Sequence, residues 1–147
     1  MSENQSDLDI DYQADRASFT FASSMDTIDE VIIEAIDYLY ARMDHVKEHA
    51  FAINLVLREG LTNAVRHGND NDPGKMVRLM LDVSQSELLK VSIEDEGQGF
   101  DWKSLSTENL PEDQDYGRGI IIMDSYFTRY SYNDAGNTLY LEKAMDA

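Results

Sequence analysis

The sequence predicts an α+β two-layer sandwich, with helices on one face of a mostly antiparallel, mixed sheet. Several short segments alternate apolar and polar residues, which indicates strands, and two longer segments repeat apolar residues every three or four positions, which indicates helices. The predicted order is strand, helix, helix, two strands, helix, two strands. Elements in this order must bury their apolar faces against each other, and one helix layer packed on one sheet achieves this.

The first half of the chain contains a predicted strand and two predicted helices. Residues 16–22 alternate as a strand, and serine and aspartate residues within 23–26 offer N-caps for a helix over 27–43. A second helix is predicted over 44–67. Its expected buried residues are Phe51, Ile53, Leu57, Leu61 and Ala64.

The second half supplies the remaining strands and one more helix. The polar residues 69–74 form a turn, and the acidic segment 101–115 has little periodicity and a length typical of functional lids. A helix is expected to begin at residue 120. The predicted strands, each with alternating residues, cover 76–83, 88–94, 128–132 and 137–142.

The bulk composition describes one small, acidic domain. Of 147 residues, 42% are hydrophobic, which is enough for one core over residues 16–147, whereas residues 1–15 are too polar to pack and are expected to be frayed. The net charge of −17 repels phosphate backbones, so direct nucleic-acid binding is not expected. No apolar run has the length of a membrane helix, and the absence of cysteine fits a cytoplasmic protein without disulfides.

One helix face places three chemically distinct polar groups in a row. Glu59, Asn63 and His67 are spaced i, i+4, i+8, and Gly68 then ends the helix. A carboxylate, a carboxamide and an imidazole on one face can hold a divalent cation and a hydroxyl group. An ordinary solvated helix face is the alternative, and this stretch by itself leaves both interpretations open.

Two glycine-rich segments follow later in the chain. Gly97 and Gly99, just after Asp95, allow the backbone to turn tightly and to approach a ligand closely. Gly117 and Gly119 precede the last predicted helix, whose N-terminus suits an anion because its amides point outward. Either segment alone is common by chance, but the order of all three motifs within one small domain is far more specific.

Together the three motifs resemble the nucleotide-binding boxes of the GHKL ATPases, which share the Bergerat ATP-binding fold. The resemblance covers residues 16–143. In the size of the chain and the residues of its motifs, it is similar to the bacterial anti-sigma-factor serine/threonine protein kinases. It implies a single histidine-kinase-like ATP-binding domain over residues 16–147. No phospho-acceptor histidine segment is recognisable before the domain, which argues against a complete histidine kinase.

The polar helix face corresponds to the N-box of this family, Glu-x-x-x-Asn-Ala-x-x-His-Gly. The residues that match it in place are Glu59, Asn63, Ala64, His67 and Gly68. The resemblance implies that Asn63 is the Mg²⁺ ligand and that His67 belongs to the nucleotide site. It further implies that Glu59 is the general base, which takes the proton from an attacking Ser or Thr hydroxyl.

The glycine segments correspond to the two glycine boxes of the family. The first box is matched by Asp95, Gly97, Gly99 and Phe100, and the second by Gly117, Arg118 and Gly119. By resemblance, Asp95 accepts a hydrogen bond from the adenine amino group, Gly97 leaves room for the base, and the second box holds the phosphates. Thr138 matches a late threonine that supports the adenine pocket, and residues 101–116 correspond to the ATP lid.

The resemblance implies an ATP- and Mg²⁺-dependent serine/threonine protein kinase that acts as an anti-sigma factor. Its expected substrate is a small antagonist (anti-anti-sigma) protein, a sigma factor is an expected second partner, and homodimerisation is compatible with the resemblance. The alternative from another class is a non-catalytic, nucleotide-binding module that acts by partner switching. The ATPase part of a larger complex is a weaker option, because no transducer domain is recognisable.

Overall fold

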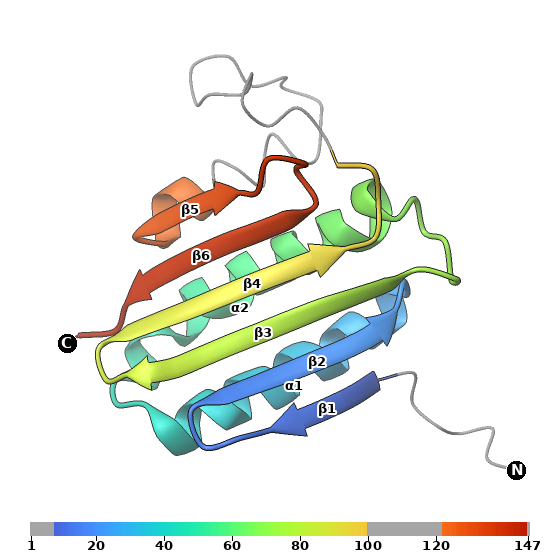
Figure 1. Cartoon of the computed structure of the whole chain (residues 1–147). Helices are drawn as coiled ribbons and strands as arrows, with labels where there is room; N and C mark the ends of the chain where they lie inside the picture. Colours follow the sequence, from blue (N-terminus) through green and yellow to red (C-terminus); the bar gives the residue numbers. More distant parts are fainter. Residues whose placement is uncertain (1–7, 100–121, 147) are drawn as a thin grey trace, which may run out of the picture.

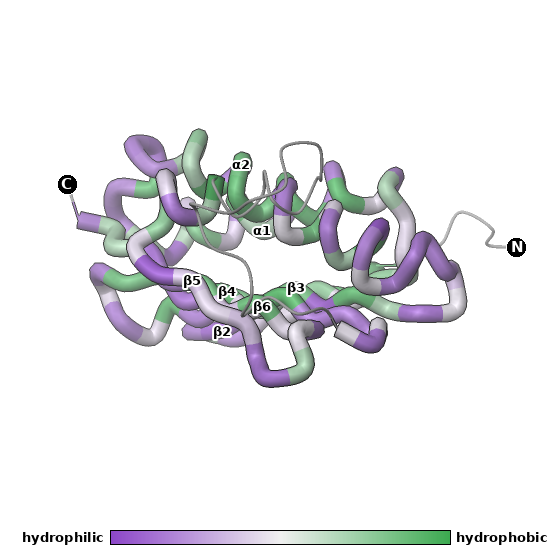
Figure 2. The backbone as a smooth tube through the Cα atoms, turned by 90° about the horizontal axis from the view of Figure 1, so that it is seen from above, coloured by the Kyte–Doolittle hydropathy of each residue, from purple (hydrophilic) through white to green (hydrophobic). Residues whose placement is uncertain are grey.

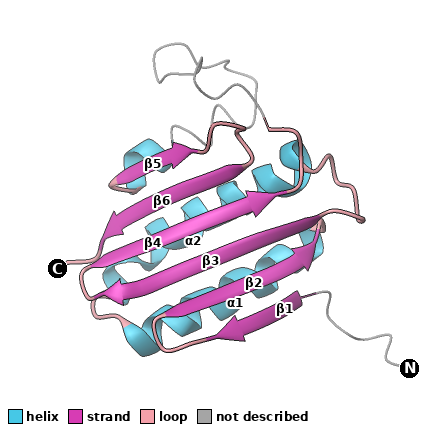
Figure 3. Cartoon of the chain, in the orientation of Figure 1, coloured by secondary structure: helices cyan, strands magenta, loops and turns pink. Residues whose placement is uncertain are grey.

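The computed structural model describes residues 8–99 and 122–146, and it has the two layers expected from the sequence (Figure 1). The six-stranded sheet has the order β1-β2-β3-β4-β6-β5, and every neighbouring pair of these strands is antiparallel. The strands, drawn in magenta in Figure 3, are β1 (Leu8–Tyr12), β2 (Arg16–Ala22), β3 (Met76–Gln85), β4 (Leu88–Asp95), β5 (Arg129–Tyr132) and β6 (Thr138–Ala144).

The helices lie on one face of this sheet, as Figure 2 shows from above. They are α1 (Met25–Arg42), α2 (Val46–Asn63) and the π-helical turn η1 (Ala64–Gly68), and residues 122–126 are helical as well. The start of α1 follows from its N-cap, because the Ser24 hydroxyl accepts a hydrogen bond from the Asp26 amide at 3.2 Å. The helix predicted over 44–67 is present as α2 and η1, and its hydrogen-bond pattern changes from α-helical to π-helical at Ala64.

The core lies between the two layers and sets how closely α2 approaches the sheet. Side chains from α1, α2 and the inward positions of the strands are fully buried there. At Gly60 an added Cβ would lie only 2.6 Å from Cδ1 of Ile93, so α2 crosses β4 with no room for a side chain at this point. This close packing brings the end of α2 next to the end of β4, where the polar motifs lie.

The N-terminal segment is more ordered than its composition suggested. Residues 8–12, expected to be frayed with the rest of 1–15, form β1, which pairs with β2 from Leu8 opposite Phe21 to Tyr12 opposite Ala17. The reason is the free edge of β2, whose backbone groups accept another strand whatever the overall polarity of that strand.

The prediction that Phe51 is buried was wrong. Its side chain is 70% exposed, whereas Ile53 and Leu57 on the same helix are fully buried. Residues two positions apart lie on different sides of a helix, so the face that buries Ile53 and Leu57 against the sheet turns Phe51 toward solvent.

Candidate nucleotide-binding site

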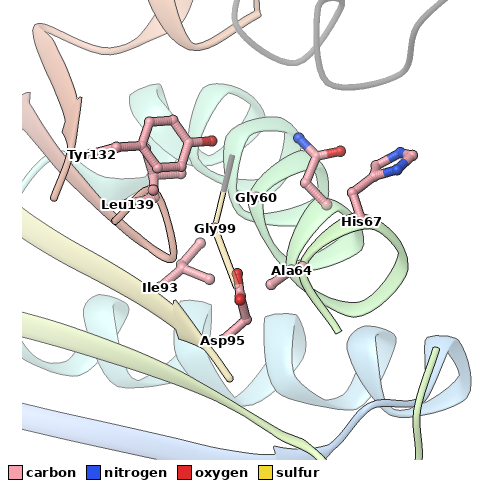
Figure 4. Close-up of a pocket in the computed structure, with 11 residues that line it drawn as sticks. Gly60, Ala64, His67, Ile93, Asp95, Gly99, Tyr132 and Leu139 are labelled. Atoms are coloured by element: carbon pink, nitrogen blue, oxygen red, sulfur yellow. The ribbon is translucent and has the colours of Figure 1, made fainter. Parts of the chain in front are cut away.

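A cavity of about 200 Å³ opens between the helix layer and the ends of the central strands. Its walls come from α2, η1, β4, β5 and β6, which are far apart in the sequence. Figure 4 shows the Asp95 carboxyl group and the Tyr132 hydroxyl pointing toward this space. The residues that carry polar groups into its lining are Asn63, His67, Asp95 and Tyr132.

Asn63 lies where α2 ends and η1 begins. Its side-chain nitrogen Nδ2 is buried and has no hydrogen-bond partner in the part of the chain that the structure describes. A buried amide without a partner is costly, so a group of this kind is commonly kept to bind something. The adjoining π-helical turn is a further feature that occurs often at functional sites.

Two other residues of the predicted helix face take different positions. His67 lines the cavity, but its ring points away from Asp95 (Figure 4). Glu59 lies one helical turn before Asn63, is half-buried and does not line the cavity. Within residues 8–99 and 122–146, the side chain of Glu59 forms no hydrogen bond or ion pair.

Asp95 ends β4 and provides the carboxyl group of the cavity. Its Oδ1 accepts a hydrogen bond from the Gly97 amide at 2.8 Å. Burial raises the pKa of Asp95 from 3.8 to about 6; the Gly97 amide and Lys75 oppose the rise in pKa, and Glu94 adds to it. Around neutral pH the group is therefore an ionised acceptor at the edge of a largely apolar cavity.

Glycines allow three chain segments to meet around Asp95. A Cβ at Gly68 would collide with the Asp95 carboxyl group, and a Cβ at Gly97 would collide with the Gly68 carbonyl oxygen. Gly99 has a φ of 85°, and a Cβ there would collide with the Ala135 carbonyl oxygen. The end of η1, the segment after β4 and the turn before β6 are thus in backbone contact, which no other residue type would permit.

Gly97→Ala should test this packing. We expect the variant to lose about 1–3 kcal/mol of unfolding free energy, because the added methyl group overlaps the Gly68 carbonyl oxygen. Urea unfolding followed by circular dichroism measures this loss. Gly74→Ala is the matched control, since its nearest neighbour is the flexible Asp72 carboxylate at 3.3 Å, and it should change stability by less than about 0.5 kcal/mol. Equal losses in both variants would contradict the packing argument.

Asn69, which the sequence analysis did not single out, locks the segments that surround the cavity. Its buried side chain donates to the Ser23 hydroxyl at 2.8 Å and to the Met76 carbonyl at 3.0 Å, and it accepts from the Glu96 amide at 2.8 Å. One side chain therefore ties the end of the helix layer to β3 and to the residues just after Asp95. A buried polar residue so fully hydrogen-bonded fixes the relative position of the elements that it joins.

The apolar walls and Tyr132 were also missed by the sequence analysis. Ile93 and Leu139 line the cavity from β4 and β6, and Tyr132 lines it from β5. Burial raises the pKa of the Tyr132 hydroxyl, and the negative charge of Asp95 raises it further. An alternating pattern indicates which residues of a strand share a face, but it cannot tell which of them border a cavity.

Several predicted site residues remain without a structural test. Thr138 starts β6, and its amide donates to Oδ1 of Asn133 at 3.1 Å, but its side chain does not line the cavity. Asn133 caps the turn before β6 and so places Gly136, which does line it. The residues that lie outside the described part of the chain are Phe100, Gly117, Arg118 and Gly119, together with the predicted lid over 101–116.

The donor set around the cavity fits one kind of metal site. Residues 8–99 and 122–146 contain no cluster of three or more His, Cys, Asp and Glu side chains that could enclose an ion. Mg²⁺ does not need such a cluster, because it usually keeps several waters and is bound by few protein oxygens together with substrate phosphates. The carboxamide oxygen of Asn63 is a ligand of the type that Mg²⁺ takes, and the unpartnered Nδ2 beside it is a donor that suits a phosphate oxygen.

The chain is similar to one known family of domains and to several known proteins. Residues 21–143 match the family described as histidine kinase-like ATPase domain. The anti-sigma F factor of Geobacillus stearothermophilus is 29% identical over 111 residues, covering 71% of this chain and 75% of that protein. The anti-sigma F factor of Geobacillus sp. (strain WCH70) is 30% identical over 110 residues, covering 70% of this chain and 75% of that protein.

A solved structure supports the fold. The histidine kinase domain from the Erythrobacter litoralis EL346 blue-light activated histidine kinase superposes with a TM-score of 0.52 and is 19% identical, covering 85% of this chain but only 62% of that chain. None of the described helices combines the length and the apolar character that crossing a bilayer requires. Since the family match extends over most of the sequence, the chain belongs to the histidine kinase-like ATPase domain family, binds ATP, and has anti-sigma F factors among its relatives.

Proposed function

We propose that the chain is an ATP-dependent serine/threonine protein kinase that acts as an anti-sigma regulatory factor. It would phosphorylate a small anti-anti-sigma (antagonist) protein and sequester a sigma factor. The observation that carries the proposal is the meeting of Asn63 and Asp95, from separate motifs, in the lining of one cavity. The names of the anti-sigma F factor relatives supply the regulatory context.

In this proposal the base of ATP lies beside Asp95. An ionised carboxylate that already accepts one hydrogen bond from Gly97 retains acceptor capacity for the adenine amino group. Guanine has a carbonyl oxygen at the corresponding position and would be repelled. Ile93 and Leu139 provide apolar surface for the flat faces of the base, so Asp95 selects the base while the strands supply contact area.

In this proposal the phosphates lie beside Asn63. Asn63 would hold Mg²⁺ through its carboxamide oxygen, and a bound Mg²⁺ would neutralise charge on the phosphates. The second glycine box, at residues 117–119, would add backbone amides there. These residues only bind and orient, which is most of what phosphoryl transfer requires.

Glu59 is the proposed general base. It would remove the proton from a Ser or Thr hydroxyl of the antagonist as the hydroxyl oxygen bonds to the γ-phosphorus and the bond to the ADP oxygen breaks. Because Glu59 lies outside the cavity but one turn from Asn63, it can reach a hydroxyl presented from outside without occupying space needed by ATP.

A labelled transfer experiment tests the proposed reaction. We expect purified chain, Mg²⁺ and γ-labelled ATP to label a cognate antagonist on Ser or Thr, which phosphoamino-acid analysis identifies by its stability to acid. Acid-labile label, as on histidine, would contradict the proposed specificity. ATP binding and partner binding without any transfer would instead support the non-catalytic partner-switching module.

The variant Asn63→Ala should distinguish the binding of Mg²⁺ from the binding of the adenine base. We expect the wild-type chain to bind ATP more tightly with Mg²⁺ than without it, and the variant to lose this difference while it retains metal-independent binding of adenosine. Calorimetry with and without Mg²⁺ measures both quantities. Asn54→Ala, on an outer position of the same helix, is the matched control and should behave as wild type. If Mg²⁺ increased the ATP affinity of Asn63→Ala as much as that of wild type, Asn63 would not be a Mg²⁺ ligand.

A further inference from the structure

Tyr132 brings a polar group into the nucleotide cavity, and the proposed function gives this group no role. Tyr132 ends β5 and lines the cavity together with Ile93 and Leu139, and its hydroxyl points into the space (Figure 4). Its ring also packs against the core. Ile93 and Leu139 supply apolar contact without a hydroxyl, so the hydroxyl of Tyr132 needs an explanation of its own.

The register of the strands fixes where Tyr132 lies relative to Asp95. Tyr132 pairs with Leu139, and Leu139 pairs on its other side with Ile93. These three residues form one row across the sheet, in which Tyr132 and Ile93 are two strand spacings, or about 10 Å, apart. Asp95 lies two residues beyond Ile93 on the same face of β4, about 7 Å further along that strand. Tyr132 and Asp95 therefore occupy opposite corners of the sheet wall of the cavity.

The corner opposite Asp95 faces the sugar of a bound nucleotide. In adenine, the nitrogen that carries the ribose lies across the ring system from the amino group. When Asp95 holds the amino group, the ribose leaves the base on the side away from Asp95, where the Tyr132 hydroxyl lies. The phosphates continue to Asn63, which belongs to the helix wall of the cavity and not to the sheet wall. The ribose is thus the part of the nucleotide that Tyr132 meets.

The Tyr132 hydroxyl suits a neutral partner of this kind. Burial raises the pKa of Tyr132, and the charges of Asp95 and Tyr130 raise it further, so the hydroxyl keeps its proton around neutral pH. A phenol hydroxyl that both donates and accepts matches a sugar hydroxyl, which has the same two capacities. A phosphate oxygen at this position would instead bring a second negative charge toward Asp95.

We propose that Tyr132 is a specificity-determining residue for the sugar of the nucleotide. Its hydroxyl forms a hydrogen bond with a ribose hydroxyl, so that the chain prefers ribonucleotides to their deoxy analogues. A site built to bond a hydroxyl rejects an analogue that lacks it, because the polar group of the protein then loses its partner. The proposal rests on the placement of the base beside Asp95 in the proposed function, but it does not depend on phosphoryl transfer.

Calorimetry with ADP, 2′-deoxy-ADP and 3′-deoxy-ADP in the presence of Mg²⁺ tests this proposal. ADP is the probe because it has no γ-phosphoryl group, so transfer does not enter the measurement. We expect wild type to bind at least one deoxy analogue about three- to ten-fold more weakly than ADP, the range for one neutral hydrogen bond. Tyr132→Phe removes only the hydroxyl. It should weaken ADP binding by the same factor and leave the affinity for that analogue unchanged.

Tyr130→Phe is the matched control. Tyr130 lies two residues earlier on β5, pairs with Leu141, packs against the same core and does not line the cavity. This variant also loses one phenol hydroxyl from the same strand, but it should retain the wild-type preference for ADP over the deoxy analogue. Loss of the preference in both variants would contradict a direct contact between Tyr132 and the sugar.

The failure of this proposal is distinguishable from the failure of the proposed function. Purine riboside diphosphate, which lacks the amino group, tests the placement of the base. If wild type binds it more weakly than ADP but binds both deoxy analogues as tightly as ADP, the base placement stands and the role of Tyr132 is overturned. A sugar preference that persists in Tyr132→Phe, or equal weakening of ADP and both deoxy analogues, would also overturn it. If wild type binds no ADP, the proposed function fails as well.

Discussion

Glu59→Gln should lower the rate of phosphoryl transfer by about 10²- to 10⁴-fold, the usual contribution of a general base. Glutamine retains the size of the side chain but cannot accept a proton. The affinity for ATP should remain within about two-fold of wild type, because Glu59 does not line the nucleotide cavity. Single-turnover transfer to the antagonist measures the rate, and calorimetry measures the affinity.

Glu48→Gln is the matched control for this experiment. Glu48 lies on the same helix and is exposed, and its contact is with His45, away from the cavity. Its transfer rate should equal that of wild type. If Glu59→Gln transferred phosphate at the wild-type rate, Glu59 would not be the base and the assignment of the helix face would be wrong.

Asp95→Asn should weaken ATP binding by about ten- to a hundred-fold, the usual range for a hydrogen bond to a charged group. Asparagine keeps one oxygen for the Gly97 amide but replaces the second acceptor with an NH₂ group that opposes the adenine amino group. Competition by GTP in a displacement assay should become relatively stronger in the variant. An unchanged preference for ATP would contradict the role of Asp95 in selecting the base.

The pH dependence of adenosine binding gives an independent test of Asp95. Its pKa is raised from 3.8 to about 6 by burial, so the carboxylate acceptor is lost as the pH falls through about 6. Adenosine affinity should therefore decrease between about pH 7 and about pH 5, and Asp95→Asn should show no such change. Adenosine is the appropriate probe because it has no phosphate that titrates in this range.

The folding stability of the chain without ligand should depend on the ionisation of Asp95 in the opposite direction to adenosine affinity. A carboxyl group whose folded pKa exceeds its unfolded value favours the fold in its neutral form. Its contribution is complete below 3.8, the unfolded value, and is lost as the pH rises through about 6. Above about pH 6 the ionised Asp95 binds adenosine best, but its buried charge then lowers the folding stability of the chain without adenosine. A hydrogen bond from the adenine amino group would offset this cost.

The sequence predicted the fold because the signals that it needs are local. Alternation in β2, β3, β4 and β6 and the apolar stripes of α1 and α2 each depend on neighbouring residues alone. The failures have a common cause. In both cases the deciding contact lies outside the local pattern. The apolar residues of α2 do not by themselves show whether Phe51 lies on the face that packs on the sheet. β1 forms only because β2 offers it a free edge.

By itself the sequence determined which chemical groups are available and in which order they occur: a carboxylate, a carboxamide and an imidazole on one helix, then an aspartate followed by spaced glycines. Only the tertiary structure decided that Asn63 and Asp95 share a cavity, that Glu59 stays outside it, and that Tyr132 joins it. The physical reason is that residue spacing fixes a side chain's direction only within its own helix or strand. Which side chains from separate elements meet depends on how closely the elements pack, and here glycines at 60, 68 and 97 set that distance.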